Sequence, residues 1–149
     1  MSLLAGYRLS DDKAELQLDV IHGFLAQTYW SPGIPRAVVE RAIANSRCVG
    51  AYAVDGRQLG FARLVTDDAT FAYLCDVFVL PEVRGQGVSK AMVGFFLDHP
   101  ELQNLRRWML ATSDAHGVYA RFGFAPPDAE QAGRLMQRLD PDVYQRMAS

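Results

Sequence analysis

Two glycines stand one residue apart, Gly85 and Gly87, in the stretch FVLPEVRGQGVSKAMVGFFL (78–97). A glycine-rich turn that opens a helix can hold a phosphate, because backbone N–H groups and the positive end of the helix dipole point at it. The P-loop lysine pair is absent, and Lys90 stands where the dinucleotide fingerprint needs its third glycine. The design that remains is R-x-x-G-x-[GA] after a strand, whose successive N–H groups cradle a pyrophosphate.

A second pattern follows in DAHGVYARFGF, where Ala115, Tyr119, Gly123 and Phe124 are spaced as A-x-x-x-Y-x-x-x-G-F. The GNAT-superfamily N-acetyltransferases carry both patterns in this order with a strand between them, and the chain resembles that family on these residues. In the first motif, RGQGVS, Ser89 replaces the usual glycine or alanine, and its backbone N–H can still donate.

The resemblance implies that acetyl-CoA is the co-substrate and that the glycine turn binds its pyrophosphate. Arg84 could make that contact through its N–H or through its guanidinium. The resemblance also implies that pantetheine lies along the strand before the turn and pairs with the main chain of Phe78 and Val79. The family's pyrophosphate contacts fall here on Arg84, Gly85, Gln86, Gly87, Val88 and Ser89.

Tyr119 matches the family's tyrosine near the CoA sulfur, so the resemblance implies that it is the general acid. A phenol with a pKa of about 10 is protonated at neutral pH and can donate a proton to a departing thiolate. The family's asparagine, seven positions earlier, is Thr112 here. We therefore expect a weaker pantetheine contact at that position.

The general base of many relatives is absent from its usual place. Those relatives carry a glutamate nine residues before the motif arginine, and that position is Cys75 here. Because side chains alternate along a strand, we expect Cys75 to share a face with Tyr73 and Val77, and Asp76 to point the other way as a structural acceptor. A water relay, or an amine that arrives neutral, could replace the base. The candidates for a direct base are His22, Tyr29, Tyr73 and His116.

The acceptor groove of this fold is usually walled by the region after the first helix, here QTYWSPGIP. Tyr29 and Trp30 could form an aromatic wall for a substrate, and they could equally cover an edge of the core. With Tyr73 and Cys75 they make up the expected substrate-binding residues. Nothing in the sequence marks a polyamine, peptide or aminoglycoside site.

Two functions follow from these residues. The first is an acetyl-CoA-dependent N-acetyltransferase that moves an acetyl group to a primary amine of a small molecule or protein by direct attack on the thioester. The alternative is a non-catalytic acyl-CoA-binding or regulatory module on the same fold. The base position at Cys75 supports the alternative, and Tyr119 opposes it.

The elements that must position these residues follow from hydrophobic spacing and turn residues. A strand at 7–9 precedes a helix that Ser10 or Asp11 can cap. The chain breaks at 29–35, and Pro35 suits the first turn of a second helix over 36–46. The apolar stripe of the first helix is Leu16, Val20, Ile21, Phe24 and Leu25.

Three strands in a meander come next. Asp55-Gly56 is a hairpin signal between strands at 47–54 and 58–65, and a turn at 67–70 leads into a third strand at 71–80. The expected elements after the glycine turn are a helix ending at His99-Pro100, a strand at 106–112, a helix at 115–124 and a last strand at 133–139.

This order predicts an α/β (α+β) fold with a GNAT-like mixed, mostly antiparallel central sheet flanked by helices on both faces. The length of 149 residues predicts a single domain over 1–149. The last segment could complete the sheet within one chain or take part in a dimer, so both a monomer and a homodimer are open.

The composition excludes several classes of function. A net charge of −2 gives no general reason to bind nucleic acid or an anionic membrane. No run approaches the length of a membrane span, and the N-terminus lacks a signal pattern, so we expect a cytoplasmic protein. Cys48 and Cys75 lie outside any CxxC pair and are expected to be buried free thiols. No metal is expected, because no ligand spacing links His22, His99 and His116.

Overall fold

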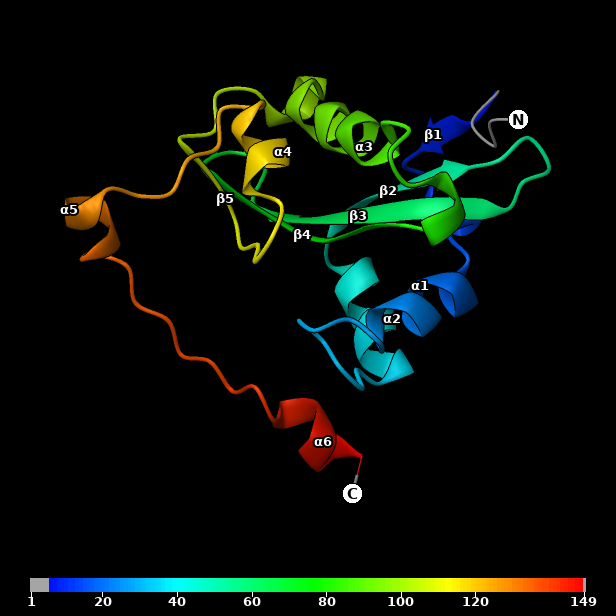
Figure 1. The fold of residues 1–149 in the computed structure, drawn as a ribbon, viewed down its shortest axis with the longest axis horizontal. Coiled ribbons are helices and arrows are strands. Elements are labelled where there is room, and N and C mark those ends of the chain that lie inside the picture. The colour runs from blue at the N-terminus through cyan, green and yellow to red at the C-terminus, as the bar shows by residue number, and fades with distance from the viewer. Residues whose placement is uncertain (1–5, 149) are drawn as a thin grey trace.

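The computed structural model describes residues 6–148, which form a five-stranded sheet with the order β1-β2-β3-β4-β5 (Figure 1). The first three junctions are antiparallel, and β4 pairs with β5 in parallel. This confirms the predicted mixed, mostly antiparallel sheet. The strands are β1 (Arg8–Ser10), β2 (Arg47–Tyr52), β3 (Gln58–Thr66), β4 (Phe71–Val79) and β5 (Arg107–Leu110).

Helices cover both faces of the sheet, as predicted. In Figure 1, α1 and α2 lie on one face, and α3 and α4 lie on the other. No helix in the described range 6–148 is long and apolar enough to cross a membrane. The α-helices are α1 (Leu18–Leu25), α2 (Arg36–Ala44), α3 (Val88–Leu97), α4 (His116–Ala120), α5 (Ala129–Ala132) and α6 (Val143–Met147), and 3-10 turns span Lys13–Glu15, Pro81–Val83 and Pro100–Leu102.

Alternation along the strands divides the apolar residues between two cores. One core packs under α3 and the other packs against α1 and α2, so each helix layer is held by its own set of buried side chains. The α3-side core contains Val49, Ala51, Ala62, Leu64, Ala72, Leu74, Val88, Met92, Val93, Phe96 and Leu102. The α1-side core contains Ile21, Leu25, Ile34, Val39, Cys48, Phe61 and Phe78.

The two turns of the meander form as their residues predict. Gly56 has φ 91°, which few other residues adopt, and the Asp55 carboxylate accepts from the Arg57 N–H at 2.9 Å. In the second turn, the Asp67 carboxylate accepts from Thr70 Oγ1 and from several backbone N–H groups. These bonds, with the Thr70 hydroxyl first, lower the pKa of Asp67.

The start of the first helix differs from the prediction. The first turn is a 3-10 turn capped by Asp12, whose carboxylate accepts from the Ala14 N–H at 2.9 Å. Ser10 is engaged elsewhere, because its hydroxyl bonds to Glu15 and accepts from the Asp12 N–H. The α-helix begins only at Leu18, so neither Ser10 nor Asp11 caps it.

The strand predicted at 133–139 is wrong. These residues form no strand and all are exposed, in an extended run between α5 and α6. Figure 1 shows this run leaving the sheet and passing below it. The apolar residues of the segment predicted a strand, but a strand also needs a paired neighbour, and no strand of residues 6–148 pairs with this segment.

Candidate functional site

A gap opens between β4 and β5 because their pairing stops early. The parallel pairs run from Phe71 and Arg107 to Leu74 and Leu110, while β4 continues to Val79. Beyond Leu74, β4 therefore has a strand on only one side among residues 6–148. The polar groups of its main chain on the other side face the gap.

Val79 supplies such groups. Leu80 donates to the carbonyl of Leu59 at 2.8 Å, and antiparallel bonds alternate along a strand. The N–H and C=O of Val79 therefore point away from β3, toward the gap, whereas those of Phe78 point toward Phe61. The Phe78 side chain is buried and stacks on Phe24 with ring centroids 4.1 Å apart. Of the two predicted main-chain contacts, Val79 is the one that the geometry favours.

A β-bulge interrupts β4 at Asp76. The register shifts between Phe61 and Arg63 of β3, and Asp76 has φ 54°. The bulge places Cys75 opposite Arg63 on the α1 side, while Val77 packs against the α3-side core. The prediction that Cys75 and Val77 share a face is therefore wrong, because the extra residue of a bulge breaks the alternation.

Asp76 also turns toward the α1 side, contrary to the prediction. Its Oδ2 accepts from Arg63 Nε at 2.8 Å, and its Oδ1 accepts from Trp30 Nε1 at 3.0 Å. Only 11% of the Asp76 side chain and 18% of the Arg63 side chain are exposed. Arg63 donates further to Ser46 Oγ at 3.0 Å. Asp76 thus lies at the centre of a largely buried polar cluster on the α1 side of β4.

Tyr29 and Trp30 attach the α1–α2 loop to both sides of the gap. The Tyr29 hydroxyl accepts from the Ser113 N–H at 3.2 Å, and the Trp30 indole reaches Asp76 on β4. The two rings meet edge to face with centroids 5.0 Å apart, and both remain exposed. The predicted aromatic wall is present at the gap, and its role in acceptor binding stays a prediction.

Cys75 and Tyr73 lie before the bulge on the face that Arg63 occupies. Burial raises the pKa of Cys75 to about 12 and also raises the pKa of Tyr73. Both side chains are therefore protonated at neutral pH. Neither has the properties of a general base that works near pH 7.

Tyr119 lies on α4 and packs against the α3-side core, with its ring edge-to-face to Phe124. Burial raises its pKa, and the nearby Tyr29 and Asp114 add to the shift. Tyr119 is therefore neutral at physiological pH and keeps a proton that it can donate.

The remaining polar candidates have other partners. The Thr112 hydroxyl accepts from the Ala115 N–H at 3.1 Å, at the start of α4. His22 bonds to the Ile34 carbonyl at 2.9 Å within the α1–α2 region. No group of three His, Cys, Asp or Glu within residues 6–148 could hold a metal ion.

The glycine turn joins β4 to α3 with an open backbone. Gly85 has φ 77° and Gly87 has φ 84°, and no atom lies within 4 Å of a Cβ built at either position. Gly87 caps α3, so the N–H groups of Val88 and Ser89 at the helix start have no partner within the helix. This open, donor-rich surface fits a pyrophosphate.

Arg84 precedes the first glycine. Its N–H donates to the Pro81 carbonyl at 3.3 Å, and its Nε donates to the Val79 carbonyl at 3.4 Å. Since the N–H has a partner within the turn, the guanidinium is the part of Arg84 that the geometry favours for a phosphate contact. The side chain is exposed beside the glycines, which leaves the guanidinium room to reach an anion.

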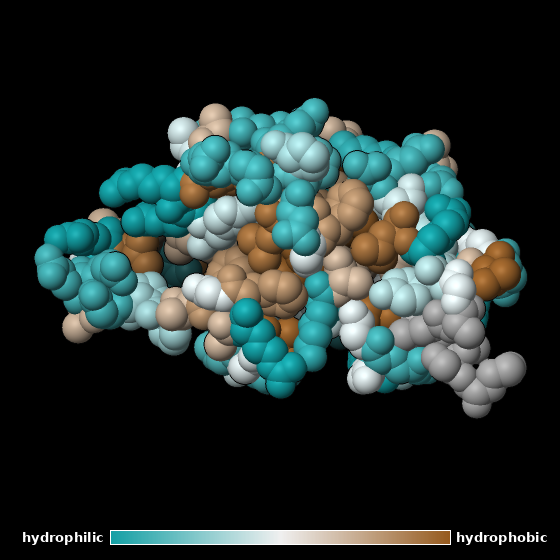
Figure 2. Space-filling model, turned by 90° about the horizontal axis from the view of Figure 1, so that it is seen from above, coloured by the Kyte–Doolittle hydropathy of each residue, from teal (hydrophilic) through white to brown (hydrophobic). Residues whose placement is uncertain are grey.

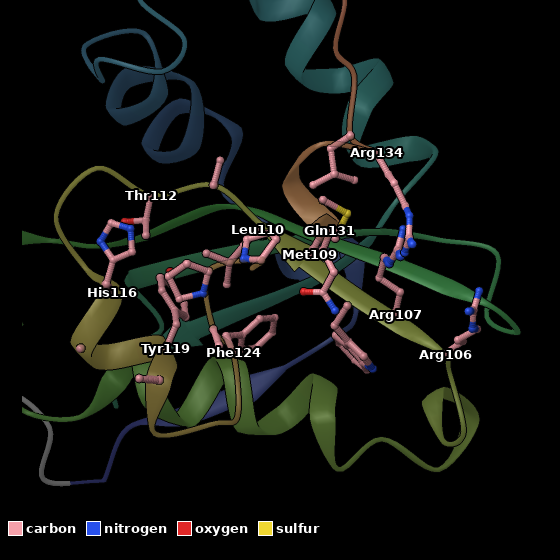
Figure 3. A pocket seen from close by; sticks show the side chains of 18 residues that line it. Arg106, Arg107, Met109, Leu110, Thr112, His116, Tyr119, Phe124, Gln131 and Arg134 are labelled. Carbon is pink, nitrogen blue, oxygen red and sulfur yellow. The ribbon is translucent and has the colours of Figure 1, made fainter. Parts of the chain in front are cut away.

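A pocket of about 1020 Å³ lies beside β5 (Figure 3). Thr112, His116 and Tyr119 line one end, and Arg106 and Arg107 line the other. Figure 2 shows the hollow between the α5 end of the molecule and its body. The pocket therefore lies along the outer edge of the sheet, with Tyr119 at one end.

Sequence reasoning missed the pairing of Arg63 with Asp76. Each charge interrupts a strand that is otherwise mostly apolar, which is a signal that could have drawn attention to them. The bulge that brings them together has no comparable signal, because its only unusual residue is an aspartate with positive φ.

Three comparisons with known proteins agree with this geometry. The model of the acetyltransferase (GNAT) family matches residues 17–124. An inferred acetyltransferase of Gibberella zeae is 31% identical over 137 residues, which cover 77% of this chain and 76% of that protein.

Solved structures with the same fold include two informative relatives. The crystal structure of an inferred GNAT acetyltransferase from Xanthomonas campestris pv. campestris is 54% identical, with a TM-score of 0.87 over 93% of this chain and 96% of that chain. A Clostridium acetobutylicum protein, described as an acetyltransferase with acetyl-CoA, is 18% identical, with a TM-score of 0.64 over 91% of this chain and 95% of that chain.

Proposed function

The chain belongs to the acetyltransferase (GNAT) family, and on that premise we propose that it transfers the acetyl group of acetyl-CoA to a primary amine of a small molecule or protein. One observation carries the proposal. The unpaired stretch of β4 leads directly into the glycine turn that opens α3, and Tyr119 packs against the same α3-side core as Val79 of that stretch.

The residues of the turn fit the pyrophosphate of CoA. Gly85 and Gly87 bring the backbone close without side chains, and the start of α3 adds N–H donors from Val88 and Ser89. Arg84 adds a positive charge, and Gln86 lies exposed between the glycines. Acetyl-CoA, which the described Clostridium acetobutylicum structure contains, would supply an activated acetyl thioester there.

The chain supplies two hydrogen-bond donors for the transfer. The Val79 N–H faces the gap and polarises the thioester carbonyl as negative charge develops on its oxygen. Tyr119, neutral because burial raises its pKa, donates its proton to the thiolate of CoA as the C–S bond breaks. The neutral amine nitrogen forms the new bond to the acetyl carbon and loses one proton to water, and the Tyr119 phenolate takes a proton back from water. The products are the amide and the free CoA thiol.

The acceptor enters on the side of Tyr29 and Trp30. Trp30 and Arg63 hold the carboxylate of Asp76 in place, and its remaining lone pairs can accept from an amine N–H at this wall. Tyr73 and Cys75 line the neighbouring part of β4. A water relay, or the arrival of a neutral amine, removes the need for a side-chain base at Cys75.

A second function has one observation in its favour. The thiol at the usual base position has a pKa raised to about 12, so a module that binds acyl-CoA without catalysis also fits the site. Release of free CoA thiol with a panel of amines separates the two functions. Thiol release that depends on an amine supports the enzyme. Acetyl-CoA binding without any such release supports the module.

A further inference from the structure

The sheet has an open edge at β5. This strand is last in the order β1-β2-β3-β4-β5, and it pairs only with β4 among residues 6–148. The outer side of an edge strand presents a row of N–H and C=O groups that can pair with another strand. The pocket described above runs along this side, and among residues 6–148 no strand fills it.

The chain also has a long segment that is exposed throughout. Every residue from 125 to 142 is exposed, and α5 is the only regular element among them. Leu135, Met136 and Leu139 lie in this stretch with 40%, 97% and 70% of their surface exposed. We call residues 133–142 the arm. Three large apolar side chains within ten residues stabilise the protein only when another surface buries them.

The arm is attached at both of its ends. At the start of the arm, Arg134 and Leu135 line the pocket beside β5. At its end, α6 docks on the face of the sheet that α1 and α2 cover. There Tyr144 packs against the α1-side core, and Gln145 Nε2 donates to the Pro32 carbonyl at 3.3 Å. Figure 1 shows that the arm between these points runs away from β5 of its own chain. While α6 stays docked, the residues after Leu135 are not available to their own sheet.

We propose that the arm of one copy pairs with β5 of a second copy, and that the exchange is reciprocal. Each chain has an open β5 edge and an uncovered arm, so a two-fold axis pairs both β5 edges with both arms and closes the assembly at a dimer. The sixth strand that the apolar residues of 133–139 predict would then form between two copies of the chain.

Charge selects the direction of pairing. In a parallel arrangement Arg134 would lie beside Arg107, and like charges on neighbouring strands destabilise a sheet. An antiparallel arrangement instead brings Asp140 to the Arg107 end of β5. Asp140 is paired with Arg146 in the described chain, so Arg107 would join or replace that partner.

The arm of the second copy would also complete the site. The pocket along β5 ends at Thr112, His116 and Tyr119, so a strand paired with β5 would form a wall next to Tyr119. The proposal nevertheless stands apart from the acetyl-transfer function, because its evidence is the exposed arm and the open edge.

The first test is the mass of the protein in solution, by light scattering after gel filtration over a wide range of concentrations. We expect twice the chain mass of 16.6 kDa. The variant Met136→Asp/Leu139→Asp should run at the mass of one chain with unchanged circular dichroism, because both side chains are exposed within a single chain. Val54→Asp, at another exposed apolar residue on the β2–β3 hairpin, should leave the dimer intact.

The second test identifies the strands that meet. One sample carries Arg107→Cys and a second carries Leu139→Cys, and a bismaleimide should link them only after the two samples are mixed and allowed to exchange. A chain mass for the unmodified protein would overturn the proposal. A dimer that survives Met136→Asp/Leu139→Asp, or a mixture in which no link forms between the copies, would overturn it as well.

Discussion

The indole Nε1 of Trp30 donates to Oδ1 of Asp76 at 3.0 Å, although 46 positions separate the two residues in the chain. The bond joins the α1–α2 loop to the bulge of β4, where Asp76 has φ 54°. Residues held in sparsely populated backbone regions cluster at functional sites, because surrounding contacts must maintain them. The contact places a fixed carboxylate beside the exposed aromatic pair.

Trp30→Phe should weaken acceptor use without weakening acetyl-CoA binding. The variant keeps an aromatic ring but removes the N–H that orients Asp76, and a hydrogen bond to a charged group is worth about 1.5–3 kcal/mol. We expect kcat/KM for the acceptor to fall about tenfold. Steady-state kinetics and calorimetry measure the two effects. A loss of acetyl-CoA affinity of the same size would contradict this role for Trp30.

Arg63→Met should lower the free energy of unfolding by about 3 kcal/mol, because it leaves the buried carboxylate of Asp76 without its cation. The matched control is Arg57→Met, which removes an exposed ion pair with Glu82 at 3.4 Å and should cost about 1 kcal/mol or less. Urea unfolding measures both variants. Adding Asp76→Asn to Arg63→Met should recover part of the loss, since asparagine tolerates positive φ and carries no charge. Equal losses of unfolding free energy for Arg63→Met and Arg57→Met would show that the ion pair of Arg63 with Asp76 is not protected from water.

Gly87→Ala should weaken acetyl-CoA binding beyond its effect on stability. Alanine at φ 84° costs about 1–2 kcal/mol of folding free energy and adds a methyl group to the surface that would face the pyrophosphate. Gly56→Ala is the matched control, because Gly56 also has positive φ and no atom near its Cβ, on a hairpin outside the site. Both variants should lose similar stability, and only Gly87→Ala should bind acetyl-CoA more weakly. Similar affinities for the two variants would remove the turn from the binding site.

Cys48 is buried as predicted, whereas Cys75 is only half-buried, and both thiols should make stability fall as the pH rises above about 9. Burial raises the pKa of Cys48 to about 11 and that of Cys75 to about 12, from an ordinary value of 9.0. Below pH 9 both states keep these protons. Above it the unfolded chain loses them first, so unfolding is favoured by up to about 1.4 kcal/mol per pH unit for each thiol.

Unfolding of the wild-type chain and of Cys48→Ala/Cys75→Ala at pH 8 and pH 10 measures this contribution. The variant is less stable at pH 8 because it loses packing, and its stability should fall less steeply with pH. The same slope in both proteins would show that the thiols ionise as readily in the folded chain as in the unfolded one.

Local signals in the sequence predicted much of the fold. Asp55-Gly56 fixes a hairpin because its backbone conformation is selected within two residues, and the same holds for the glycine turn that caps α3. The failures depend on distant partners. The segment 133–139 has the apolar residues of a strand, but pairing is not a property of one segment. Before α1, Asp12 caps a separate 3-10 turn, and α1 itself begins after Gln17 without a side-chain cap.

The candidate site was predicted to a similar extent. The glycine turn opens α3 as its motif indicated, and the roles of the turn and of Tyr119 stay predictions. The predicted directions of Asp76 and Val77 were wrong because strict alternation was assumed from Cys75 to Val77, where the bulge adds one residue. The contacts of Asp76 with Trp30 and Arg63 join three separate parts of the chain, and no spacing within one segment reveals them.

The most direct test of the acetyl-transfer account is the rate of CoA thiol release by Tyr119→Phe, compared with the wild-type chain on the best amine found. Acetyl-CoA affinity is measured on the same samples, and Tyr144→Phe on α6 serves as the control. Loss of a general acid should lower turnover by about 100-fold or more, with acetyl-CoA affinity and the control unchanged. Turnover equal to that of the wild-type chain would contradict the role of Tyr119 and the acetyl-transfer mechanism built on it.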